Sequence, residues 1–144
     1  MKKDLEKEAI ALISKDNAFS LVYVEEEVLF FSTKRGIVPL FDLVGDKTPA
    51  SLSFLADRCI GKAAAFLVIQ LEIKKVYASI ISEPALVLLL NNGVQVSYGL
   101  LVPEIRSHSG DSMCPFEKAV VSCLDPQEAH LAIGETLKGL RLAS

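Results

Sequence analysis

Lys62 is a residue whose charge sets it apart from its surroundings. It carries the only charge between Cys59 and Ile69, which is otherwise an apolar run, and burying a cation without a partner is costly. Gly61 interrupts this run, so we expect a buried helix to begin near it. Two interpretations remain open. Either Lys62 extends its ammonium to solvent at the end of the helix, or Gly61, Lys62 and the first amides of the helix face an anionic ligand.

Cys114 and Glu117 lie on either side of Pro115, a residue that favours the first turn of a helix. A helix N-terminus favours thiolate over thiol, so Cys114 is a candidate nucleophile, and His108 or Lys62 would help if either lay nearby. Glu117 is a candidate general acid or base if it is buried. The alternatives are a cysteine that caps the helix without reacting and a glutamate that only stabilises the helix dipole.

Ser82 begins a further expected helix. It is a plausible N-cap, with Pro84 in the first turn, an apolar run after it, and Asn91-Asn92-Gly93 as a left-handed stop. We count Ser82 with Gly61 and Lys62 as a candidate ligand-binding residue.

The elements that must position these residues follow from hydrophobic periodicity and turn signals. We expect a helix over 5–17, a short helix and loop over 37–49, a helix over 61–71, another over 85–90, and two more beginning at 115 and 126. We expect strands over 19–24, 28–31, 76–81 and 94–100, the last one half-buried. The alternation predicts an α/β fold, a three-layer sandwich with a mixed sheet, helices on both faces and an antiparallel pair at its beginning.

Composition limits the function classes. The 144 residues fit a single domain, 1–144, and the net charge of -3 gives no cationic stripe for nucleic acid. Uncharged apolar runs are too short for a membrane span, and the mixed charges of the N-terminus do not resemble a signal peptide, so we expect a cytoplasmic protein. The 51% hydrophobic content is somewhat high for a small monomer, which leaves a homo-oligomer possible.

Cys59 and Cys123, His130 and the run Glu25-Glu26-Glu27 are expected to have no role in chemistry. The three cysteines lack CxxC spacing, so we expect reduced thiols, with Cys59 and Cys123 packed against the core. His130 is expected on the surface of the last helix. Glu25-Glu26-Glu27 is expected to form a charged turn between two strands.

Two segments resemble altered pieces of the signature of zinc-dependent deaminases. Those enzymes carry H-x-E at the start of one helix and P-C-x-x-C at the start of the next, with a strand between them. The corresponding segments here are Lys62-Ala63-Ala64 and Pro84-Ala85-Leu86-Val87-Leu88. The ligand positions would be Lys62, Ala85 and Leu88, which cannot bind zinc, and Ala64 cannot transfer a proton. We therefore expect no zinc and no other cofactor.

The chain also resembles, over most of its length, an uncharacterised prokaryotic family called domain of unknown function 1893. The resemblance rests on Lys34-Arg35-Gly36-Ile37-Val38-Pro39-Leu40, Gly61-Lys62-Ala63-Ala64-Ala65 and Cys114-Pro115-Phe116-Glu117. It implies a cytidine-deaminase-like fold, and it brings no established activity with it.

Three functions follow from these residues. The preferred one is a metal-independent domain that binds a small molecule, such as a nucleotide or another anionic metabolite, through Lys62. The alternative is an enzyme that uses Cys114 as a nucleophile or sulfur carrier, with Lys62 holding negative charge. A third class is an oligomeric interaction module. We expect no nucleic-acid or membrane partner.

Overall fold

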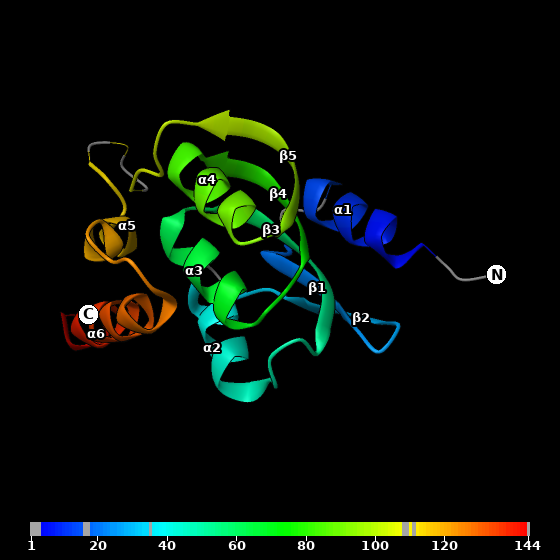
Figure 1. The fold of residues 1–144 in the computed structure, drawn as a ribbon, viewed down its shortest axis with the longest axis horizontal. Helices are drawn as coiled ribbons and strands as arrows, with labels where there is room; N and C mark the ends of the chain where they lie inside the picture. Colours follow the sequence, from blue (N-terminus) through cyan, green and yellow to red (C-terminus); the bar gives the residue numbers. More distant parts are fainter. Residues whose placement is uncertain (1–3, 16–17, 35, 108–109, 111, 144) are drawn as a thin grey trace.

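The structure, a computed structural model, describes residues 4–15, 18–34, 36–107, 110 and 112–143. They form a mixed sheet of five strands with helices on both faces (Figure 1). This arrangement confirms the predicted α/β class and the mixed sheet.

The sheet has the strand order β2-β1-β3-β4-β5. Its strands are β1 (Leu21–Glu25), β2 (Val28–Ser32), β3 (Leu52–Ile60), β4 (Lys75–Ser82) and β5 (Gln95–Val102). The β1–β2 and β1–β3 pairs are antiparallel, whereas β3, β4 and β5 are parallel to one another. The predicted antiparallel pair at the beginning of the sheet is therefore confirmed, and the carboxyl ends of three parallel strands meet at one edge.

Six helices precede, connect or follow these strands in the described residues. They are α1 (Leu5–Lys15), α2 (Val38–Asp46), α3 (Lys62–Gln70), α4 (Glu83–Asn91), α5 (Pro115–Val120) and α6 (Pro126–Ala143). The predicted cap of α6 is present, because the Asp125 carboxylate accepts a hydrogen bond from the Glu128 amide at 2.9 Å. None of the described helices has both the length and the apolar character needed to cross a bilayer.

Two separate cores hold the layers together. On one face, α1 packs Ala9 and Ile13 against Val22, Phe54 and Ala56 of the sheet. On the other face, α3 is central, with every residue from 63 to 68 buried, and α2, α4, α5 and α6 surround it (Figure 1). The N-terminus of α3 is thereby held between the sheet and the C-terminal helices.

Two expectations about the strands were incomplete or wrong. The segment 52–60 is a full strand, β3, which we did not assign because its apolar residues run on into those of α3 with only Gly61 between. The last strand, β5, is not half-buried but largely exposed, with Tyr98 at 42% and Leu100 at 55%. The alternation of β5 fits a strand with one apolar face, but it does not show that the strand lies at the edge of the sheet.

Candidate functional site

The predicted site residues gather where the parallel strands β3 and β4 end. A single residue, Gly61, separates β3 from α3, and α4 follows β4 directly. Ile60 of β3 is in register with Ile81 of β4, so Gly61 and Ser82 follow neighbouring positions at the same edge of the sheet. Ligands of open α/β sheets bind outside the carboxyl ends of parallel strands, which is where this edge lies.

The Glu117 carboxylate occupies the N-terminus of α3. It accepts hydrogen bonds from the amides of Lys62 at 2.7 Å and Ala63 at 2.9 Å, although Glu117 belongs to α5. Gly61 makes this approach possible, because a Cβ at that position would overlap the carboxylate. The anion expected at the start of α3 is thus supplied by the chain itself.

Burial governs the ionisation of Glu117. The residue is 8% exposed, and burial raises the pKa of its carboxyl, while the amides of Ala63 and Lys62 and the Lys62 charge oppose that rise. A buried carboxyl that has two hydrogen-bond donors is well positioned, and its proton affinity is raised, as a general acid or base requires.

Lys62 holds the end of α5 against the start of α3. Its ammonium donates to the carbonyl oxygen of Val121 at 3.0 Å and lies 5.7 Å from the centre of the Phe66 ring. Both contacts are internal, yet the hydrogen bond is exposed, and an ammonium has three donors. Lys62 therefore has a structural contact and retains donors at the surface of the site.

Asp57 adds a second carboxylate that sequence reasoning missed. It lies on β3, where its Oδ1 accepts a hydrogen bond from the Cys59 amide at 3.3 Å. Burial raises the pKa of Asp57 to about 7, against the opposing effect of the Cys59 and Arg58 amides. The signal was an acid within an apolar run, which could be interpreted only once 52–60 was known to be a strand that ends at Gly61.

The three thiols have different surroundings. Cys59 is not packed into the core as expected but has exposed surface. Even so, burial, followed by the charges of Asp57, Glu117 and Cys114, raises the pKa of its thiol to about 12. Those charges act on Cys59 because the four groups share one region. Cys123 is buried as predicted, and burial raises the pKa of its thiol.

Cys114 occupies the predicted N-cap position of α5. It is partly buried, and its side chain makes no capping hydrogen bond. The helix has six residues, so its dipole acts on Cys114 less than that of a longer helix would. His108, the base suggested as an aid to Cys114, lies outside the described residues.

Ser82 has the capping role that the sequence predicted. Its hydroxyl accepts a hydrogen bond from the Ala85 amide at 3.3 Å, and the residue is fully buried. The bond provides an acceptor for one of the first amides of α4, which have no partner within the helix. Ser82 is therefore a local N-cap of α4, next to the N-terminus of α3 that Glu117 caps.

The positions that would bind zinc in a deaminase have side chains that cannot do so. Ala64 and Ala85 are buried in the core, and Leu88 packs against it. None of these side chains has a lone pair to offer a metal, and Lys62 brings a positive charge. Among the described residues, no three His, Cys, Asp or Glu side chains converge as a metal site.

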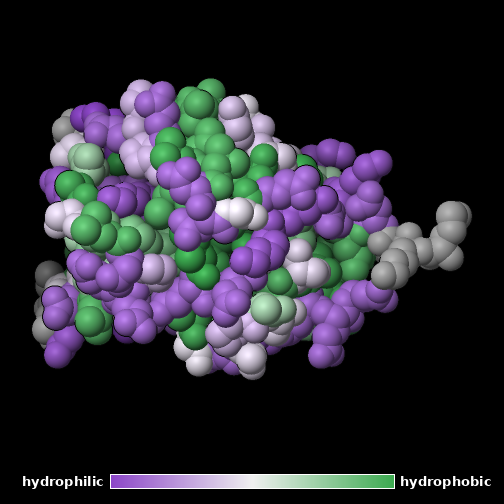
Figure 2. All heavy atoms as spheres, in the orientation of Figure 1, coloured by the Kyte–Doolittle hydropathy of each residue, from purple (hydrophilic) through white to green (hydrophobic). Residues whose placement is uncertain are grey.

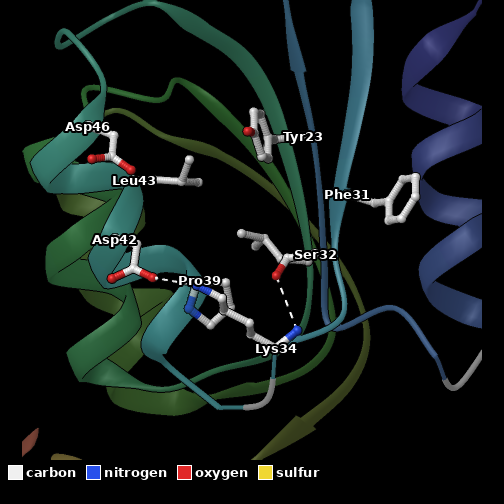
Figure 3. A pocket seen from close by; sticks show the side chains of 9 residues that line it. Tyr23, Phe31, Ser32, Lys34, Pro39, Asp42, Leu43 and Asp46 are labelled. Atoms are coloured by element: carbon white, nitrogen blue, oxygen red, sulfur yellow. Dashed lines mark hydrogen bonds and ion pairs between the residues drawn. The ribbon is translucent and has the colours of Figure 1, made fainter.

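A second concave feature lies between the β1–β2 hairpin and α2. It is a groove of about 220 Å³ whose walls include Tyr23, Lys34 and Asp42. Figure 3 shows Lys34 reaching from the end of β2 toward Asp42 on α2, where their ion pair measures 3.3 Å. Leu21, another lining residue, is in register with Asp57 of β3. The groove therefore begins next to the strand that carries Asp57.

Two residues outside the site also differ from expectation. His130 is not a free surface residue: its ring stacks on Phe41 with centroids 4.9 Å apart, and its Nδ1 lies 3.1 Å from Gln70 Oε1. Glu25, expected in a charged turn, ends β1 and pairs with Lys47 at 2.7 Å. Both contacts join segments distant in sequence, which the local pattern could not reveal.

Comparison with known proteins identifies the family. The family model described as "Domain of unknown function (DUF1893)" matches residues 8–137, so the chain belongs to this family. Among solved structures, a DUF1893 family protein from Thermotoga maritima is similar, with a TM-score of 0.80 and 30% sequence identity over 96% of this chain and 92% of that one. No curated protein matches the chain.

Proposed function

We propose that this DUF1893 protein is a cytoplasmic, metal-independent domain that binds a small molecule where β3 ends. The observation that carries the proposal is the position of Glu117, buried on the first amides of α3 in the same region as Asp57, Cys59 and Cys114. Buried ionisable groups with shifted pKa values concentrate at functional sites. Their position outside the carboxyl end of a parallel strand supports a binding site there.

A cytidine-deaminase-like sandwich is the fold that we propose for this site. Its support is the order of elements: a strand, α3, the parallel strand β4 and then α4, with the altered signature segments at the two helix starts. Zinc has no ligands there, because Ala85 and Leu88 replace the cysteines of the signature. Elemental analysis of dialysed protein should accordingly find far less than one zinc per chain, and stoichiometric zinc would contradict this part of the proposal.

The ligand that best fits these groups combines a polar, uncharged edge with an anionic group. Near neutral pH, Asp57 exchanges its proton, so it can both donate and accept a hydrogen bond, as the edge of a nucleobase requires. The ammonium of Lys62 can bind a phosphate with the donors that Val121 does not use. We therefore favour a nucleotide-like ligand, with Gly61 and Ser82 shaping the floor of the site.

The experiment is a thermal-shift panel of the four nucleoside 5′-monophosphates, with free nucleosides and ribose 5-phosphate as fragments. A ligand that binds only the folded state raises its apparent stability, so we expect at least one monophosphate to raise the Tm more than either of its fragments. Lys62→Ala should weaken that binding, whereas the exposed Lys138→Ala on α6 should not. No shift from any compound at millimolar concentration, or equal binding by Lys62→Ala, would reject the proposal.

A second candidate is the enzyme that uses Cys114 as its nucleophile. It is favoured by one comparison, since burial raises the pKa of both Cys59 and Cys123 and so reduces their thiolate fraction. We expect iodoacetamide at neutral pH to label Cys114 first, as mapped by mass spectrometry on the native protein. Faster labelling of Cys59 or Cys123 would leave this alternative without its nucleophile.

A further inference from the structure

We propose that β5 is a dimerisation edge, which pairs antiparallel with β5 of a second copy of this chain and joins two sheets into one. The proposal concerns a different surface from the ligand site, and it rests on the backbone and side chains of β5 and α4.

The outer edge of β5 presents unpaired backbone groups. β5 lies at the end of the sheet, and no further strand in the described residues pairs with it. Its parallel register with β4 runs without a shift from Gln95 to Val102, and the Gln95 amide donates inward to the Lys74 carbonyl at 2.8 Å. Because strand hydrogen bonds alternate in direction, Val96, Tyr98, Leu100 and Val102 direct their N–H and C=O groups outward.

This edge lacks the devices that keep edge strands of monomers apart. Such strands are short, twisted by bulges, or carry lysine or proline to prevent pairing. β5 has eight residues, no charged side chain and no proline between Gln95 and Val102. No repulsion between like charges therefore opposes the approach of a second, identical strand.

Apolar side chains continue from β5 onto α4, which packs beside it. The exposed fractions are 55% for Leu100, 42% for Tyr98, 56% for Val87 and 55% for Leu90. Figure 2 shows hydrophobic residues gathered around α4 and the adjacent end of β5. A standard interface buries roughly 800 Å² per partner, and the paired backbone, together with the 36% exposed Leu101 on the other face of β5, adds to the area of this patch.

The geometry of a twofold axis selects a register. An axis perpendicular to the sheet keeps each residue on its own face, so the antiparallel pairing must be centred on a residue. Centring on Gly99 places Tyr98 opposite Leu100 of the second copy and Val96 opposite Val102. All the outward backbone groups then find partners, and the cross-strand pairs join an aromatic with an aliphatic side chain, which stabilises sheets.

The test is the mass of the protein in solution, measured by light scattering at about 100 μM, where even a dimer with a Kd of about 10 μM is mostly assembled. We expect twice the chain mass of 15.6 kDa for the parent protein. Leu100→Lys and Tyr98→Lys should each give monomers, because each would bury an ammonium opposite an apolar or aromatic side chain without an anionic partner. Leu131→Lys, at a 68% exposed leucine of α6, is the matched control and should remain dimeric.

Hydrogen exchange provides the second readout, because it identifies the strand that is covered. In the parent, the amides of Val96, Tyr98 and Leu100 should exchange more slowly as the protein concentration rises, and Leu100→Lys should abolish that dependence. Circular dichroism checks that the variant is folded. A monomeric parent, a dimer that survives both lysine substitutions, or a dimer with concentration-independent exchange at β5 would overturn the proposal.

Discussion

Two consecutive strand–helix units of this domain, β3–α3 and β4–α4, have the same architecture and opposite chemistry. They are parallel neighbours in register, with Asp57 of β3 beside Ala78 of β4 and Cys59 beside Ile80. At the strand ends, Gly61 and Lys62 follow β3, whereas β4 ends at Ser82 and is followed by Glu83. The ionisable groups therefore collect at the first unit, while the second provides a closed, apolar neighbour.

The two helices are also capped differently. Ser82 satisfies α4 from within its own turn, three residues from the Ala85 amide. Glu117 accepts from the first amides of α3 although it lies 54 and 55 residues away in sequence. The N-cap residue of α3 is Gly61, which has no side chain to accept these bonds. A local cap serves only the helix, whereas a distant cap also ties α5 to the sheet edge. We therefore favour the first unit as the place of the proposed site, because its cap also holds α5, whereas the cap of the second unit serves only α4.

Asp57→Asn tests the charged side of the comparison and should have the largest effect. Burial raises the pKa of Asp57 from 3.8 to about 7, so the folded protein binds a proton that the unfolded chain has released. The contribution of Asp57 to stability is therefore present below pH 4 and is lost as the pH rises to about 7, by up to about 4 kcal/mol. Asn keeps the shape and an acceptor oxygen but cannot ionise.

Chemical unfolding across pH provides the measurement for Asp57→Asn. The variant should be more stable than the parent at pH 8, and the difference should vanish near pH 3. Asp46→Asn, at an exposed position on α2, serves as the control and should show no such trend. Parallel curves of stability against pH for the parent and Asp57→Asn would show that folding does not raise the pKa of Asp57.

Glu117→Ala removes the distant cap of α3. Two amides lose a charged acceptor, and the Ala63 amide lies on a residue that is 1% exposed. We expect a loss of about 2–3 kcal/mol in urea unfolding at pH 7, since each hydrogen bond to a charged group contributes about 1.5–3 kcal/mol and part is offset by relief of the buried charge. Glu117→Gln should recover part of it. Glu135→Ala on the exposed side of α6 should change little, and an equal loss there would contradict the capping role.

Gly61→Ala tests the same cap from the other side. The backbone of Gly61 is extended, with φ -96°, so alanine is tolerated there in itself. The added methyl would displace the Glu117 carboxylate, and we expect a loss of about 2 kcal/mol, close to that of Glu117→Ala because both remove one interaction. Gly45→Ala in α2, where a Cβ meets nothing, should instead stabilise by up to about 1 kcal/mol. A neutral Gly61→Ala would mean that Glu117 can cap α3 from elsewhere.

Ser82→Ala should have the smallest effect of the series, about 1 kcal/mol, because it removes a single local, uncharged cap. The loss should be additive with that of Glu117→Ala, since the two substitutions act on different helices. Thermal or urea unfolding of the double variant measures this. A strongly non-additive loss would show that the caps of α3 and α4 depend on each other, and it would contradict the distinction between the two units.

The same contrast explains what the sequence could predict. Ser82 with Pro84, and Asp125 with Glu128, are local patterns, so the starts of α4 and α6 were predicted correctly. The sequence also predicted that a helix starts near Gly61 and that Glu117 is a candidate functional residue. It could not show that they touch, because that contact depends on how α5 packs against α3.

Residues with long-range partners were predicted least well. Asp57 lies in a largely apolar run whose strand continues almost directly into a helix, and only Gly61 separates the two. The exposure of β5 depends on its place at the edge of the sheet, which the chain order alone does not fix. His130 stacks on Phe41 of α2 and lies within hydrogen-bond distance of Gln70 of α3, both distant in sequence.

The most direct test of the proposed ligand site is a map of backbone amide chemical shifts during titration with the nucleoside monophosphate that stabilises the protein most. We expect the largest shifts at the amides of Cys59, Lys62, Ala63 and Glu117, whereas the amide resonance of Ala85, in the locally capped α4, should shift little. Shifts confined to the groove around Ser32 and Lys34, or spread along β5 alone, would contradict a binding site at the end of β3.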